Sequence, residues 1–214
     1  MHRHDLALAV TLAAAAGYLD VIGFIVLSGH FVSFMSGNST QMATALGKGE
    51  WYLVGPPAAL VAVFYAGVVL GALLDRLPGG RLTVLGGTFV LVVATAALAV
   101  VFPARLPVII GLPLAMGAVN ATFLVDGQTS VGVTYMTGAL VKSGQSLVDA
   151  MFGGPRFVWL RHLALWSGLA AGGVIGALMH TVVGVPGAIA IDAAVIAVVL
   201  AVTAGMRLTS HALG

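Results

Sequence analysis

The sequence predicts an all-α polytopic membrane protein that is built from two repeated halves. Of its 214 residues, 60% are hydrophobic and only 7% are charged, which leaves too little polar surface to cover a water-soluble globule. A polar motif at residues 33–40, S-F-M-S-G-N-S-T, returns in shorter form at residues 134–138 as T-Y-M-T-G. High hydrophobicity and a duplicated polar motif together favour a membrane protein with an internal repeat.

Two further matches accompany this motif in the same order. The tetrapeptide G-Y-L-D at residues 17–20 aligns with G-A-V-N at residues 117–120, and the glycine-rich segment 66–73 aligns with segment 171–178. Three matches in one order indicate that the chain arose by duplication.

The apolar segments predict how often the chain crosses the membrane. A spanning helix needs about 20 predominantly apolar residues, and three such segments lie in each half, residues 1–104 and residues 105–214. An odd number of crossings places the two halves in opposite orientations, which is the inverted-repeat plan of many transporters. The predicted crossings are residues 6–27, 53–74, 82–102, 106–125, 163–183 and 185–206.

The first crossing carries a carboxylate, Asp20, and the fourth crossing carries Asn120 at the aligned position. A charged side chain at membrane depth is costly unless it faces protein or water. Two roles are therefore open for Asp20: it binds a proton or cation during transport, or it caps a broken helix. His180 and Asp192 in the last two crossings are second-rank candidates.

Each motif is predicted to enter the membrane as an extended strand followed by a short helix. The β-prone runs are residues 31–35 and 131–136, and Ser36 and Thr137 have the residue types of helix N-caps. Irregular backbone at this depth is tolerated only where protein buries it or water lines it. The two helix N-termini would point toward each other near the midplane, where free N–H groups suit a polar or anionic solute.

The candidate solute-binding residues lie in these motifs and in the crossings before them. Lys142 follows Thr137 by five residues, roughly 7 Å along a helix, and its ammonium either reaches the solute or extends outward to the membrane surface. The candidate residues are Asp20, Ser36, Gly37, Asn38, Thr40, Gln41, Asn120, Tyr135, Thr137, Gly138 and Lys142.

The basic residues predict the orientation of the chain. By the positive-inside rule, the side with more arginines is cytoplasmic, and with six crossings it holds both termini. A rival model lets each motif cross completely and gives eight crossings with the same six-to-two division of charge. We favour six, because eight crossings would place the densest basic loop outside. One side holds Arg3, Arg76, Arg81, Arg156, Arg161 and Arg207, and the other holds Lys48 and Arg105.

Glycines repeat at helical spacing in the second and fifth crossings. Gly67 and Gly71 align with Gly172 and Gly176. Small residues four apart lie on one face of a helix and permit close contact with another helix. That contact forms either within the chain or in a homodimer.

Several classes of function are disfavoured by what the sequence lacks. The chain has no cysteine, which excludes disulfides, thiolate metal sites and cysteine nucleophiles. It has no metalloprotease or serine-hydrolase motif and no metal-binding spacing, so we expect no enzyme, no cofactor and no metal. Scattered Lys and Arg residues argue against nucleic acid as a partner. The apolar run at the N-terminus is long enough to be a crossing rather than a cleaved signal.

The motifs of this chain resemble those of the YoaK-like family of bacterial inner-membrane proteins, catalogued as a domain of unknown function. The resemblance extends over nearly the whole chain and implies a multi-pass protein of the bacterial inner membrane with a basic loop after its second crossing. It supplies no substrate. Family members often have an arginine at Lys142, and lysine keeps the charge but loses bidentate geometry. The residues that carry the resemblance are 17–20, 34–38, 117–121 and 134–142.

These observations predict a small secondary transporter for a polar or anionic solute, with the lipid bilayer as its surroundings. A channel with the same two half-helices is the nearest alternative. A non-transporting assembly protein built on the glycine faces is a third, although such a protein has no use for polar motifs at membrane depth. The solute and the coupling ion stay open.

Overall fold

A computed structural model describes residues 3–125, 128–129, 132 and 134–212, and these residues are almost entirely helical. The strands among them form one short antiparallel pair, in which Leu124 faces Thr129. In chain order the elements are α1 (Arg3–Val26), α2 (Met35–Lys48), η1 (Trp51–Leu53), α3 (Gly55–Asp75), α4 (Arg81–Val101), α5 (Arg105–Val119), η2 (Asn120–Phe123), β1 (Leu124–Val125), β2 (Gln128–Thr129), α6 (Met136–Met151) and α7 (Val158–Ala212).

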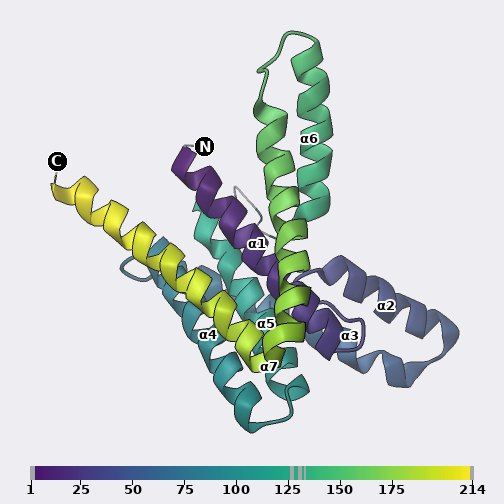
Figure 1. Cartoon of the computed structure of the whole chain (residues 1–214). Coiled ribbons are helices and arrows are strands. Elements are labelled where there is room, and N and C mark those ends of the chain that lie inside the picture. Colours follow the sequence, from purple (N-terminus) through teal and green to yellow (C-terminus); the bar gives the residue numbers. More distant parts are fainter. Residues whose placement is uncertain (1–2, 126–127, 130–131, 133, 213–214) are drawn as a thin grey trace.

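Five helices in the described part of the chain are long and apolar enough to cross a membrane, where the sequence predicts six. The difference lies in α7, whose apolar stretch is 51 residues long. Gly184 has a non-helical backbone (φ 70°, ψ −177°), and Pro186 follows it. Figure 1 shows the chain reversing its direction at this break. The segments on either side, 158–183 and 185–212, cover the last two predicted crossings.

The longest contact in the fold joins α1 to α7, and α3 packs along α5 in the same way. Both contacts depend on glycine. A Cβ atom on Gly172 would collide with the carbonyl oxygen of Ala14, and one on Gly67 would collide with that of Leu114. Further along, Gly176 and Gly71 meet the backbones of Tyr18 and Ala118. The predicted glycine faces are therefore buried within one chain.

These close contacts occur at equivalent positions of the two halves. In the sequence alignment Ala14 corresponds to Leu114, and Gly172 corresponds to Gly67. The third contact follows the same rule, because Gly17 meets the carbonyl of Leu169 while Gly117 meets that of Phe64. The first helix of each half thus packs on a helix of the other half, an arrangement that favours the predicted duplication.

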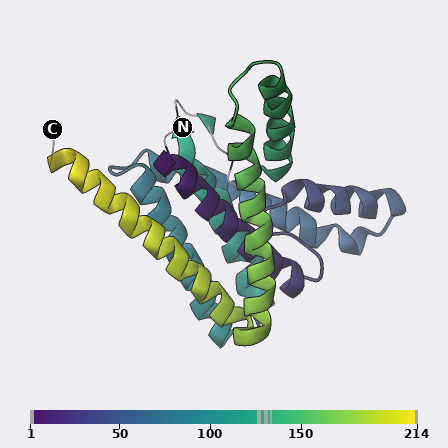
Figure 2. The same cartoon turned by 45° about the horizontal axis from the view of Figure 1, so that its top comes forward.

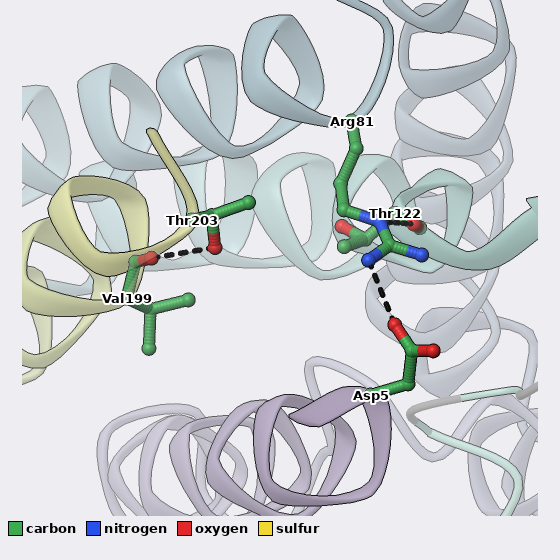
Figure 3. Close-up of polar contacts among 5 residues, drawn as sticks. All are labelled: Asp5, Arg81, Thr122, Val199 and Thr203. Atoms are coloured by element: carbon green, nitrogen blue, oxygen red, sulfur yellow. Dashed lines mark hydrogen bonds and ion pairs between the residues drawn. The ribbon is translucent and has the colours of Figure 1, made fainter. Parts of the chain in front are cut away.

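The helices α1 and α5 run in opposite directions. Arg81 joins the start of α1 to the end of α5, since its Nη1 lies 3.0 Å from Asp5 Oδ1 and its Nε donates to the carbonyl of Thr122 at 3.1 Å (Figure 3). At the other end, the Nη1 of Arg105 lies 3.5 Å from the Ser28 hydroxyl. The two chain termini lie toward the same end of the molecule (Figure 1).

We predict that alanine at Gly67 or Gly172 destabilises the protein. The added Cβ meets a backbone carbonyl that cannot rotate away, so the helices must separate, at a cost of about 1–3 kcal/mol. Thermal unfolding in detergent measures the effect. Gly86→Ala in α4 is the matched control, because no atom lies within 4 Å of its Cβ position. Equal melting temperatures for Gly67→Ala and Gly86→Ala would contradict the close contact.

Candidate functional site

The side chain of Asp20 holds the loop that leads into α2. Its Oδ1 accepts hydrogen bonds from the backbone N–H groups of Val32 and Ser33, both at 2.8 Å, and its Oδ2 accepts the Ser33 hydroxyl at 3.0 Å. All three residues are buried. This is the capping role that the sequence left open for Asp20, and the loop backbone that it bonds could not otherwise be buried at low cost.

Asn38 completes the same loop from within α2. It is fully buried, its Oδ1 accepts from the Phe31 N–H at 3.0 Å, and its Nδ2 donates to the Phe31 carbonyl at 2.7 Å. Gln41 donates from Nε2 to the carbonyl of Gly29 at 2.8 Å. The strand predicted at residues 31–35 does not form, because these amide side chains supply the bonds that a neighbouring strand would otherwise make.

The second motif repeats this anchor in a weaker form. Asn120 lies where Asp20 lies, and its Oδ1 accepts from the hydroxyl of Thr134 at 3.3 Å. Thr134 aligns with Ser33, so the same pair of positions is joined in both halves. Asn120 also donates from Nδ2 to the Met116 carbonyl at 2.8 Å. The β-prone run predicted at 131–136 lies partly outside the described residues.

Both short helices begin two residues earlier than predicted. Ser36 and Thr137 are not the N-caps. The cap residues are Phe34 (φ −88°, ψ 73°) and Tyr135 (φ −87°, ψ 60°), and neither makes a side-chain cap hydrogen bond. In each case the first helical N–H bonds two residues back, to the carbonyl of Ser33 or Thr134, at 3.1 Å. These are inverse γ-turns, which start a helix without the hydroxyl that the sequence pattern suggested.

The candidate residues separate into two groups. Asp20, Asn38 and Asn120 are buried and Gln41 is half-buried, and all four bond the protein's own backbone or side chains. Gly37 is half-buried against aromatic rings, since a Cβ there would lie 2.7 Å from the Phe34 ring. The side chains or backbones that remain exposed are those of Ser36, Thr40, Tyr135, Thr137, Gly138 and Lys142.

The exposed group lies on two helices that pack on different partners. α2 packs chiefly against α3, and α6 packs against the first segment of α7, where the Ser143 hydroxyl donates to the Trp159 carbonyl at 3.0 Å. Figure 2 shows the two short helices beside these partners on separate parts of the molecule. The structure therefore fixes each helix start on its own anchor.

A cavity of about 460 Å³ lies away from both motifs, where the basic loop, the start of α4 and the end of α7 meet. Arg81 lies in its wall and also stacks over the Phe123 ring, 5.2 Å from its centroid. Thr203, on the α7 side, donates to the Val199 carbonyl at 2.7 Å (Figure 3). The sequence predicts the charge of this loop but no binding role for it.

Three buried polar atoms in the described part of the chain have no hydrogen-bond partner: Tyr18 Oη, Thr122 Oγ1 and Asp192 Oδ2. From the sequence, Asp192 is a second-rank candidate and Tyr18 and Thr122 carry no signal. A carboxylate inside a crossing was the only signal available for any of them. Within the described residues, no group of three or more His, Asp or Glu side chains lies close enough to hold a metal ion.

We predict that Asp20→Ala lowers the melting temperature in detergent far more than Asp20→Asn does. Alanine leaves two buried N–H groups without an acceptor, at about 1–3 kcal/mol each, whereas asparagine keeps one acceptor oxygen, as Asn120 does. Asp149→Ala is the control, because Asp149 is exposed. If Asp20→Ala and the wild type have the same melting temperature, the carboxylate does not hold the loop.

Comparison with known proteins places the chain in a family. Residues 8–202 match the family described as "Protein of unknown function (DUF1275)". The chain is 32% identical over 174 residues to the UPF0700 transmembrane protein RA0705 of Rhizobium meliloti (strain 1021), an alignment that covers 81% of this chain and 75% of the relative. No solved structure matches it. The chain therefore belongs to the DUF1275 family of membrane proteins, which confirms the YoaK-like resemblance of its motifs.

Proposed function

We propose that this protein is a secondary transporter for a small polar or anionic solute, with two inverted halves of three crossings each. The observation that carries the proposal is the duplicated anchor. Asp20 joins Ser33 and Asn120 joins Thr134, on two helices that run in opposite directions. A duplicated polar anchor of this kind would present two short helix starts from opposite sides of the membrane, as inverted-repeat transporters do.

The lengths of the two short helices favour six crossings over eight. α2 has 14 residues and α6 has 16, which correspond to about 21 and 24 Å at 1.5 Å per residue. Both fall short of the roughly 30 Å hydrocarbon core of a bilayer. Each motif would then enter and leave on one face, and the break at Gly184 would divide α7 into the fifth and sixth crossings.

The orientation follows from the basic side of the molecule. The Nη1 of Arg207 donates to the Gly79 carbonyl at 2.9 Å, so the C-terminal end of α7 lies beside the loop that carries Arg76 and Arg81. Asp5, near the start of α1, is joined to the same loop. By the positive-inside rule this side would face the cytoplasm of a bacterium, with both termini.

The exposed candidate residues provide the groups that would bind the solute. Ser36 and Thr137 lie in the first turns of their helices, where backbone N–H groups and the helix dipole favour negative charge. Lys142 would add a positive charge one turn further along α6. These features suit a small anion or a solute rich in hydrogen-bond acceptors at the helix starts.

A two-step experiment tests the function. Inorganic phosphate, small carboxylates and neutral polyols are first screened for those that raise the melting temperature of the purified full-length protein. Counterflow of each stabilising solute is then measured in proteoliposomes. We expect saturable counterflow, which only a carrier gives. Flux without counterflow would indicate a channel, and no flux of any stabilising solute would favour an assembly protein.

We predict that an introduced cysteine at Lys48 labels from outside intact cells and one at Arg76 only after the membrane is opened. Both side chains are exposed, and the chain has no native cysteine, so all labelling with a membrane-impermeant maleimide comes from the introduced thiol. The six-crossing orientation gives this result. The reverse pattern, with position 76 outside, would support eight crossings.

We predict that Gly138→Ala and Lys142→Gln weaken binding of an anionic solute without lowering stability. No atom lies within 4 Å of a Cβ on Gly138, so alanine fits the folded chain and only hinders close approach of a ligand. Gly144→Ala is the matched control on the same helix, because its Cβ position is equally open. The measurement is the solute-induced rise in melting temperature. Unchanged shifts in both variants would place the site elsewhere.

A further inference from the structure

We propose that Asp192 is the proton-binding site of this protein and that Tyr18 is its hydrogen-bonding partner when the proton leaves. The inference rests on the proposed transporter function, because a proton site inside the membrane couples solute movement to a proton gradient. The coupling ion, which the sequence left open, would then be the proton. It would bind at Asp192 and not at Asp20.

Asp192 lies in the second segment of α7, eight residues after the break at Gly184. Its side chain is 2% exposed, and its Oδ2 atom is fully buried without a hydrogen-bond partner. An ionised carboxylate in such a place carries a large desolvation cost unless a cation or several donors compensate it. The neutral acid, in which one oxygen carries the proton, avoids that cost.

The helices that pack against α7 carry few ionisable side chains. α7 packs against α1 and α4, and its first segment also packs against α6, which carries Lys142 and Asp149. α4 has no ionisable side chain between residues 82 and 101, and between residues 6 and 26 α1 has only Tyr18 and Asp20. In the first segment of α7, which also packs on α1, the ionisable side chains are Arg161, His162 and His180.

Tyr18 lies on α1, which packs on α7, and it is near enough to Asp192 for a charge on the carboxylate to affect the phenol. Tyr18 is 5% exposed, and its hydroxyl is buried without a partner. A phenol can accept a hydrogen bond from a protonated carboxyl and donate one to a carboxylate. A small movement that brings the two oxygens together would therefore stabilise Asp192 after it releases its proton.

Asp20 already has a structural task. Its two oxygens accept three hydrogen bonds from the loop before α2. Protonation of Asp20 would break at least one of them and loosen the start of α2. Asp20 on α1 thus has a structural task and Asp192 on α7 has none, and these two helices pack together.

Dicyclohexylcarbodiimide tests the inference without any solute. A protonated carboxyl adds across one of its C=N bonds: the proton goes to nitrogen, the carboxyl oxygen bonds to carbon, and the adduct rearranges to a stable N-acylurea that peptide mass spectrometry locates. We expect the full-length protein in detergent to be labelled at Asp192, and less so as the pH rises. Asp192→Asn should lose the label and Asp20→Asn should keep it. Labelling that survives Asp192→Asn, or no labelling of the wild type, overturns the inference.

Two further arms make the test specific. Tyr18→Phe removes only the hydroxyl, so we expect labelling of Asp192 to persist to higher pH than in the wild type. If sodium chloride blocks labelling while choline chloride does not, Asp192 is a sodium site and the proton is the wrong ion. Labelled Asp192 without transport of any solute would overturn the proposed function alone, and transport without labelling would overturn this inference alone.

Discussion

The structure depends on one requirement, which is that every backbone polar group inside a membrane needs a partner. The chain leaves helical structure between α1 and α2, and side chains then supply the missing bonds. Asp20 accepts two backbone N–H groups, and Asn38 bonds both the N–H and the carbonyl of Phe31. Asn120 and Thr134 make the corresponding contact in the second half. Because α2 and α6 start directly after these anchors, the position of every exposed polar group on them depends on the same few hydrogen bonds.

The glycine contacts connect these anchors to the packing of the two halves. Gly17 meets Leu169 three residues before Asp20, and Gly117 meets Phe64 three residues before Asn120. Each first helix therefore packs on the other half immediately before its anchor. The main contact of each first helix is made with the other half. A movement of one half against the other would therefore shift a helix at the point where it holds its motif.

Much of this arrangement could be predicted, and the remainder depends on contacts that a sequence does not display. Composition and the repeat predicted the apolar helices, the aligned glycines and the importance of Asp20. The partners of those glycines belong to distant helices and have no local signal. The caps were placed at Ser36 and Thr137 because hydroxyls usually cap helices, whereas aromatic γ-turns at Phe34 and Tyr135 have no such signature. The burial of Asp192 without a hydrogen-bond partner for its Oδ2 arises only when the helices pack around it, which the sequence does not show.

The two halves differ most where their chemistry would matter for transport. The anchor of the first half is a carboxylate with three hydrogen bonds, and that of the second is a neutral amide with a longer bond to Thr134. Two residues before these anchors, Tyr18 interacts with Asp192, while its aligned residue Ala118 has no polar side chain. Asp20 is thus held by the loop before α2, whereas Asp192 has an oxygen without a hydrogen-bond partner, and the residue aligned with Tyr18 carries no hydroxyl.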